Sequence, residues 1–274
     1  TMNFRYAQGG GALMVFSLVV LFKCRRYILC FFRPNSLSDL DPAERTELRI
    51  SSFLFIFGSL GIMATLWLGM GAHPGYTVFV YIFILLLTIG MIRAVAEGGI
   101  LGFQAPSGPF HMIRAFLGMR KDWVAPAFFA PLMVYYSVFF FDLKTFIAPA
   151  MANGIKIRDD LKMSRVRFHV SIVIGLLIAV AVGVGLEIAM SYVPGRGADN
   201  MELWFHTIFP KTLYEQVAAM VEVPPAPAPA EGRWVLAGAG MMTALLFFRQ
   251  RCFWLPHPLG LIMLINPIMR AYWF

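Results

Sequence analysis

The stretch YTVFVYIFILLLTIGMIRAVAEGGILGFQAPSGP, residues 76–109, decides the fold class of this chain. Tyr76 to Ile92 carries no charge and is long enough to form most of a membrane-spanning helix. Arg93 to Pro109 follows at once and contains four glycines and two prolines. Because glycine and proline both weaken helices, we expect the backbone to turn or break there.

An ionisable pair stands at the start of this break. Arg93 and Glu97 are four residues apart, so on a helix they share one face and can pair. Broken backbone at membrane depth survives only when it is buried in protein or lines a watery cavity. The pair is therefore the best functional lead in the sequence. The alternative is that both residues mark the cytosolic end of a span and that the glycines form a loop.

Composition supports an integral membrane protein. The chain is 59% hydrophobic and only 14% charged, whereas a soluble domain carries roughly a quarter charged residues. We predict an all-α, polytopic bundle of transmembrane helices with broken or re-entrant segments. The net charge of +8 does not indicate a nucleic-acid partner, because Lys and Arg gather in the cytosolic loops of membrane proteins.

Several further stretches are apolar enough for membrane spans, and a polar loop with a short cytosolic helix starting at Asp41-Pro42 is expected between the first two. The chain as a whole is predicted to be one transmembrane domain over residues 1–274. Because apolar segments lie at both of its ends, we expect a piece of a longer protein. The predicted spans besides 76–96 are 9–32, 50–71, 168–193 and 234–248, with the start of a last one at 261–269.

Hydropathy leaves the middle of the chain with two interpretations. The basic segments Arg114–Lys121 and Lys156–Arg167 both look cytosolic. The stretch 124–152 would then enter and return as two half-helices that meet near 141–144, and discontinuous helices of this kind mark transporter sites. The alternative is that 98–118 crosses the membrane instead.

The segment 194–233 is predicted to be external. Within it, residues 202–221 carry apolar side chains at helical spacing, divided by Pro210, and favour an amphipathic segment on the membrane surface. The run Pro224-Pro225-Ala226-Pro227-Ala228-Pro229 predicts a short extended linker of polyproline type.

The candidate site residues are ionisable or polar groups at the Gly/Pro breaks and at the centre of the proposed half-helices. His257, between two prolines, titrates near neutrality and could carry protons, although a lone histidine is more often a structural hydrogen-bonding residue. For Asp142 and Lys144 the alternative is a solvated turn. The predicted substrate or ion pathway consists of Arg93, Glu97, Gly98, Gly99, Gln104, Asp142, Lys144 and His257.

The sequence offers no grouping for catalysis, for a metal or for a cofactor. Its three cysteines, Cys24, Cys30 and Cys252, lack metal-type spacing and are best explained as small apolar packing residues. We therefore expect no enzyme activity, no metal and no cofactor. The expected partners are the lipid bilayer, a small-molecule solute and, as an open option, further copies of the chain.

Three short pieces carry a family resemblance: Arg93-Ala-Val-Ala-Glu-Gly-Gly99, Trp204-Phe205 in the long external segment, and Trp254-Leu-Pro-His-Pro-Leu-Gly260 after a basic span end. In that order they resemble the C-terminal half of an uncharacterised bacterial membrane family related to the oligopeptide transporter superfamily. The resemblance implies a secondary transporter of many spans in the inner (plasma) membrane. It also implies broken central helices and proton-coupled uptake of a small peptide or metal chelate.

A non-transporting scaffold subunit of a larger membrane complex is the second hypothesis. The glycine-rich spans and the surface-lying segment suit such a subunit equally well, because small residues let helices approach closely in lipid. A membrane enzyme ranks third.

Overall fold

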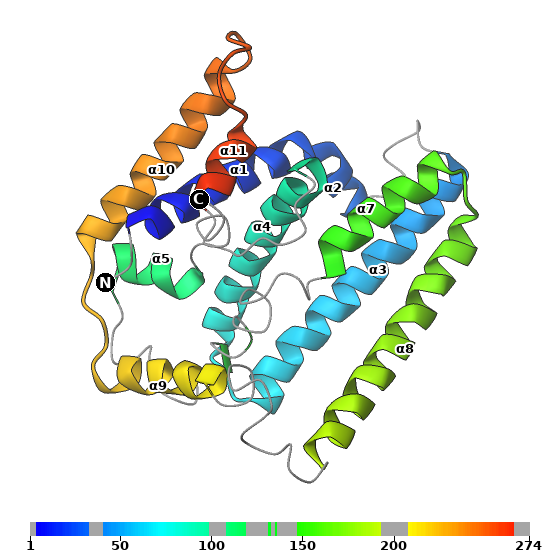
Figure 1. Cartoon of the computed structure of the whole chain (residues 1–274), viewed down its shortest axis with the longest axis horizontal. Coiled ribbons are helices and arrows are strands. Elements are labelled where there is room, and N and C mark those ends of the chain that lie inside the picture. Colours follow the sequence, from blue (N-terminus) through cyan, green and yellow to red (C-terminus); the bar gives the residue numbers. More distant parts are fainter. Residues whose placement is uncertain are drawn as a thin grey trace. The chain divides into compact units, whose positions relative to one another are not determined.

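The computed structural model describes residues 4–32, 41–98, 108–118, 131–132, 135, 147–192 and 208–265. Regular structure in these residues is entirely helical, with ten α-helices and one π-helical segment (Figure 1). The chain divides into two compact units, Thr1–Pro149 with Ala219–Phe274, and Ala150–Ala218. The prediction of an all-α fold is confirmed; the prediction of one transmembrane domain stays a prediction.

Among the described residues, four helices are long and apolar enough to cross a membrane. They are α1 (Phe4–Lys23), α3 (Pro42–Ala64) with its π-helical extension η1 (Thr65–Gly69), α4 (Pro74–Gly98) and α8 (Arg165–Ser191). These helices confirm the sequence predictions that placed spans at 50–71, 76–96 and 168–193, and they indicate a multi-pass membrane protein.

The first predicted span is shorter than expected at its C-terminal end. The helix begins at Phe4 and ends at Lys23, and a second helix, α2 (Arg25–Phe32), follows after a turn at Cys24. The predicted single span over 9–32 is therefore wrong in its bounds. Lys23, Arg25 and Arg26 explain the difference, because a cluster of charges favours water over the bilayer interior.

The loop helix predicted at Asp41-Pro42 and the span predicted from Ile50 form one continuous helix. Pro42 takes the first helical position, as the sequence indicates, whereas the Asp41 side chain makes no capping hydrogen bond. The next turn is tight: η1 ends at Gly69 and α4 begins at Pro74. The charged first turns of α3 are thus part of the same helix as its apolar span.

The centre of the first unit is a close contact between α1 and α10 (Pro229–Phe248). A side chain at Gly11 would collide with the carbonyl oxygen of Val235, and one at Gly238 would collide with that of Gln8. The two helices run in the same direction, because Phe4 lies against Trp234 with ring centroids 5.2 Å apart while Gln8 faces Gly238. Glycines on both helices allow this approach of one backbone to the other.

α4 packs on the other side of α1 and also contacts α3. A side chain at Gly90 would meet the side chain of Ser17, whose hydroxyl donates to the Leu13 carbonyl at 2.8 Å. The Tyr81 hydroxyl donates to Ser59 Oγ at 2.6 Å and joins α4 to α3. In the described part of the unit, the fully buried side chains come mainly from α1 and α4: Ala7, Ala12, Leu13, Val80, Leu87 and Met91.

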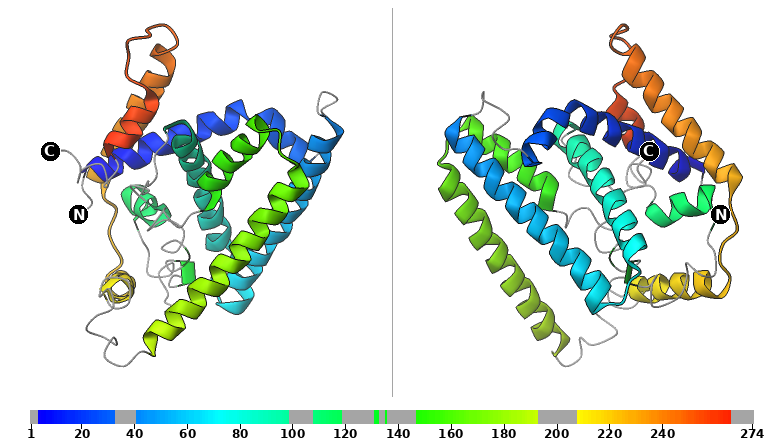
Figure 2. Two further views of the ribbon diagram at one scale, coloured as in Figure 1. Left: turned by 45° about the vertical axis from the view of Figure 1, so that its right-hand side comes forward. Right: turned by 180° about the vertical axis from the view of Figure 1, so that it is seen from behind.

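Figure 2 shows that α1 and α10 lie together at their first residues and diverge toward their last. The short helix α11 (Pro258–Ile265) packs against α1, α10 and α4. Another short helix, α5 (Pro109–Phe116), packs against α10 and α4. The Gly/Pro break predicted around 254–260 is confirmed, since residues 249–257 contain no helix.

The second unit contains α8, most of α7 (Ile147–Asp160) and most of α9 (Phe209–Glu222). Lys162, at a φ of +51°, lies in the turn between α7 and α8. The Arg158 guanidinium lies over the ring of Phe168 at 5.7 Å and pairs with Asp159 at 2.7 Å. The described side chains of α8 give it no buried face within its span.

Prolines lie in the first turns of α9 and α10. Pro210 lies in the first turn of α9, where its missing N–H leaves no hydrogen bond unmade. The first part of the predicted amphipathic segment, 202–207, lies outside the described residues, so the division at Pro210 stays a prediction. Pro229 likewise begins α10 instead of ending the extended linker. The predicted span at 234–248 thus belongs to a longer helix, whose charged first turn lowers its hydropathy, and α10 is not among the four apolar helices above.

Candidate functional site

A pocket of about 430 Å³ opens where α1 and α10 diverge. It is lined by the last turns of α1 and α4, by the residues around the end of α10 and by the start of α11. Apolar walls come from Phe16, Val19, Val20 and Leu246, next to the thiol-bearing Cys24 and to Pro258. Its polar lining consists of Lys23, Arg93, Glu97, Arg249, Gln250 and His257.

The ionisable pair predicted on α4 forms as expected. α4 continues past both residues to Gly98, so Arg93 and Glu97 lie one helical turn apart and make an ion pair between Nη2 and Oε1. The side chains remain 55% and 32% exposed. A pair this open contributes little to stability, because water screens its attraction. Its position at a pocket is therefore its more informative property.

His257 reaches the same pocket from the second Gly/Pro break. Its Nδ1 accepts a hydrogen bond from the backbone N–H of Leu259 at 3.2 Å, so the neutral ring carries its proton on Nε2. Burial lowers the pKa of His257, and the nearby Arg249 lowers it further, whereas Glu97 acts in the opposite direction. The neutral form is thus favoured at neutral pH, with one N–H free of the backbone contact.

The structure brings together three of the predicted site residues, Arg93, Glu97 and His257, from two segments far apart in sequence. Gly98 ends α4 without lining the pocket. The other four lie outside the described residues, as does the proposed meeting point of two half-helices near 141–144: Gly99, Gln104, Asp142 and Lys144.

Sequence reasoning missed Lys23, Arg249 and Gln250 as pocket residues. The basic residues at the ends of α1 and α10 were interpreted only as markers of the cytosolic side. A signal was present: if several spans end on the same side, their terminal basic residues can meet there. Which of the helices are neighbours is a tertiary property, however, and α1 meets α10 through glycines more than two hundred residues apart.

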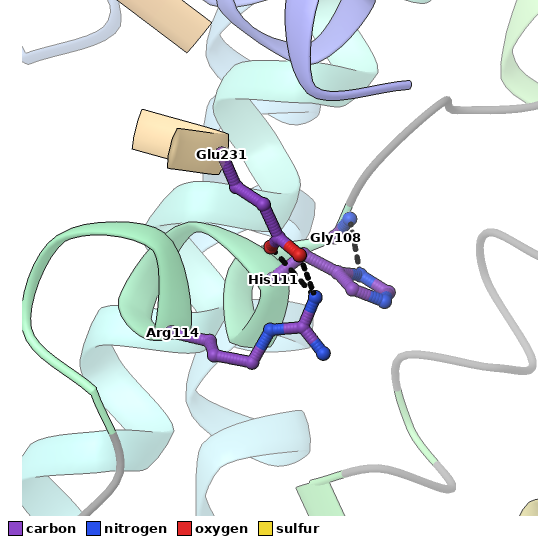
Figure 3. A network of polar contacts seen from close by, with 4 residues as sticks. All are labelled: Gly108, His111, Arg114 and Glu231. Atoms are coloured by element: carbon purple, nitrogen blue, oxygen red, sulfur yellow. Dashed lines mark hydrogen bonds and ion pairs between the residues drawn. The ribbon is translucent and has the colours of Figure 1, made fainter. Parts of the chain in front are cut away.

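A second polar cluster lies at the other end of α10 (Figure 3). Arg114 of α5 donates through Nη2 to both carboxylate oxygens of Glu231, at 2.8 and 2.6 Å. The side chains are only 19% and 11% exposed. This is a largely buried ion pair, for which loss of one partner is costly because the other charge stays buried.

His111 belongs to the same cluster and is half-buried. The backbone N–H of Gly108, which precedes α5, donates to its Nδ1 at 3.3 Å. Burial lowers the pKa of His111, as does Arg114, while Glu231 partly opposes the shift. The ring is therefore held neutral beside the ion pair.

Backbone contacts also join the start of α10 to α5. The Ala228 N–H donates to the Arg114 carbonyl at 3.2 Å. Gly118, at a φ of +70°, has room for no side chain against Pro227, whose Cδ would lie 2.6 Å from an added Cβ. Gly232 likewise approaches the Ala115 carbonyl. The cluster is thus a packed junction between α5 and α10.

This junction corrects the sidedness predicted for the middle of the chain. Arg114 was expected on the cytosolic side and the start of α10 on the external side, yet Arg114 lies 2.6 Å from Glu231 in the first turn of α10. Arg249 marks the other end of α10, next to the end of α4. The two expectations cannot both hold. If the start of α10 is external, Arg114 is external too and the premise of paired half-helices at 124–152 fails; if Arg114 is cytosolic, the start of α10 is cytosolic as well.

Within the described residues, no group of three or more His, Cys, Asp or Glu side chains lies close enough to hold a metal ion. Cys24 and Cys252 are free thiols. The described polar side chains of the pocket are ones that form ion pairs and hydrogen bonds.

Comparison with known proteins places the chain in one family and gives no activity. No curated protein and no solved structure matches it significantly. No link to the oligopeptide transporter superfamily is shown, so that resemblance stays a prediction. One family model, described as a family of unknown function, matches residues 1–274. Since this match covers the whole sequence, the chain belongs to that family, DUF6785.

Proposed function

We propose that the chain is part of a secondary transporter and that the pocket between α1, α4, α10 and α11 belongs to its solute pathway. The convergence of Arg93, Glu97 and His257 on one pocket carries the proposal. Two of its walls, α1 and α4, are long apolar helices that could cross a membrane. Ionisable groups that face a cavity between such helices are rare and mark substrate or ion pathways.

Proton coupling is supported by the chemistry of the pocket. Glu97 and His257 can each take up and release a proton, and Arg93 is placed to pair with Glu97 only while that carboxyl is ionised. Protonation of Glu97 would release Arg93 toward the pocket. A change of partner of this kind is a simple way to link proton binding to solute binding.

The resemblance described above suggests a small peptide or a metal chelate as the solute and the inner membrane as the location. Both remain part of the proposal. The volume of about 430 Å³ is in the range of sites that hold small organic molecules, roughly 300–1,000 Å³.

The test is uptake into proteoliposomes that contain the purified protein, with an imposed pH gradient and labelled dipeptides or a ferric chelate as solutes. Glu97→Gln should abolish gradient-driven uptake. Glu215→Gln is the matched control, because Glu215 forms an exposed i,i+4 pair with Lys211 outside the pocket. Uptake that is equal in both variants would exclude the pocket from the pathway.

A scaffold subunit is the second candidate function, and α8 favours it. Among the described residues, no part of its apolar span has a buried side chain, which suits a helix that packs against lipid or against helices of another protein. A partner that copurifies at fixed stoichiometry, together with no uptake of any solute, would favour this alternative.

A further inference from the structure

The pocket has more positive than negative charge. Three cations, Lys23, Arg93 and Arg249, line it with one carboxylate, Glu97, which is already paired with Arg93. Among the described residues, neither Lys23 nor Arg249 makes an ion pair. Two full positive charges therefore face a shared space without a compensating acid.

The neutral polar groups of the pocket add donors. His257 uses Nδ1 to accept the Leu259 N–H, which leaves Nε2–H as its donor. Gln250 contributes an amide with two N–H groups. Glu97 is the only carboxylate among the described residues of the lining, and Arg93 occupies one of its oxygens.

Helix dipoles oppose anion binding here, because α1, α4 and α10 all end at the pocket. Each C-terminus carries roughly half a negative elementary charge, and the effect fades within a turn. Lys23 and Arg249 carry full charges in those same terminal turns. The residues at the helix ends thus outweigh the backbone contribution.

We propose that this pocket binds an anionic group, a phosphate or a carboxylate, through Lys23 and Arg249, with His257 as a neutral donor. The inference rests on the proposed function in that it names the solute class of the same pocket. Oxyanions are the natural partners of Arg and Lys because charge-assisted hydrogen bonds are strong. The volume admits a phosphorylated or carboxylated small molecule in addition to a single inorganic ion.

Two sources could supply this chemistry. A soluble anion would enter the pocket as a transported or regulatory solute. An anionic lipid would place its headgroup there, since basic pockets between membrane helices at the cytoplasmic side also bind such headgroups. The experiment therefore uses both kinds of probe.

The purified protein in a neutral detergent is titrated calorimetrically with inorganic phosphate and, separately, with short-chain phosphatidic acid. The variants are Lys23→Gln and Arg249→Gln. Arg251→Gln is the matched control, because Arg251 lies two residues beyond Arg249, is exposed and does not line the pocket. Lys23 is exposed and Arg249 half-buried, so both variants should fold, and their melting temperatures check this.

Each pocket variant should weaken binding by about tenfold or more, as expected for loss of a hydrogen bond to a charged group, while the control stays at the wild-type value. An effect seen with phosphate supports a soluble anion, and an effect confined to phosphatidic acid supports a lipid headgroup. No binding of either probe, or equal weakening by Arg251→Gln, would overturn the inference. Anion binding without any uptake would contradict only the transport proposal, and uptake that needs Glu97 without anion binding would contradict only this inference.

Discussion

The two ends of α10 use the same kinds of charged residue in opposite ways. At its start, Glu231 and Arg114 are matched one to one, largely buried and enclosed by backbone contacts. At its end, Arg249 shares an open pocket with two other cations and a single carboxylate. The arrangement at the start of α10 is typical of a structural contact between helices. The arrangement at the end of α10 is typical of a binding site for a charged group.

Solvation explains why the two arrangements differ. A buried charge is tolerated only when a partner and hydrogen bonds replace its lost water, so the start of α10 needs a close match. An excess of charge is tolerated where water has access, and the Arg93 side chain in the pocket lining is 55% exposed. Mutations at the start should therefore affect folding, whereas those at the end should affect binding.

The first prediction is that the two ends of α10 lie on opposite sides of the membrane. With Cys24, Cys30 and Cys252 replaced, Leu117→Cys at the end of α5 and Arg251→Cys beyond α10 should react with an impermeant thiol reagent from opposite sides. A helix of the length of α10 separates the two positions, about 30 Å at 1.5 Å per residue. Labelling of both from one side would contradict the assignment of the two ends.

The largest energetic effect is expected at the buried pair. Glu231→Gln should lower the free energy of unfolding by about 3–5 kcal/mol, because it leaves the Arg114 guanidinium buried without an acid. Denaturant unfolding in detergent measures the change, and Glu222→Gln on the exposed end of α9 is the control. The double variant with Arg114→Met should recover part of the loss; if it does not, the cost has another origin.

The glycine contact between α1 and α10 should give a smaller effect. Gly238→Ala places a methyl group on the Gln8 carbonyl, so the helices must separate, at a cost of about 1–3 kcal/mol. Gly240→Ala, two residues on in the same helix, meets nothing within 4 Å. It should be neutral or stabilising by about 0.5–1 kcal/mol. The measurement is the melting temperature of the two variants. Equal melting temperatures would contradict the close approach of the α1 and α10 backbones at Gly238.

The smallest effect is a pH dependence of stability. Because burial lowers the pKa of His111, the folded state binds fewer protons than the unfolded state. Stability should be fully present above pH ~6.5 and decline as the pH falls below it. His111→Gln should flatten the melting temperature between pH 7 and 5 more than His257→Gln, whose ring is exposed at the pocket. If His257→Gln flattened the melting temperature more than His111→Gln, the pH dependence of stability would come from the pocket and not from the junction of α5 and α10.

Three properties could be predicted from the sequence alone: the all-α membrane class, the spans around α3, α4 and α8, and the pairing of Arg93 with Glu97. These properties are local: apolar length and helical spacing are readable along one segment. The sequence also identified His257 as worth attention because the Gly/Pro break around it is local too. The bounds of the first span and the role of Pro229 differ from the sequence prediction, since charge position and first-turn geometry decide them.

The segments that meet in space could be identified from the three-dimensional fold but not from the sequence. The fold placed His257 with the α4 pair, added Lys23 and Arg249 to the pocket, and joined Arg114 to Glu231. The sequence indicates that basic residues at span ends can meet, but it does not say which spans are neighbours, because the glycines that bring α1 and α10 together lie at opposite ends of the chain and could pack against any helix. The physical reason is that helix formation depends on neighbours in sequence, whereas a pocket depends on which backbones can approach closely enough to enclose it.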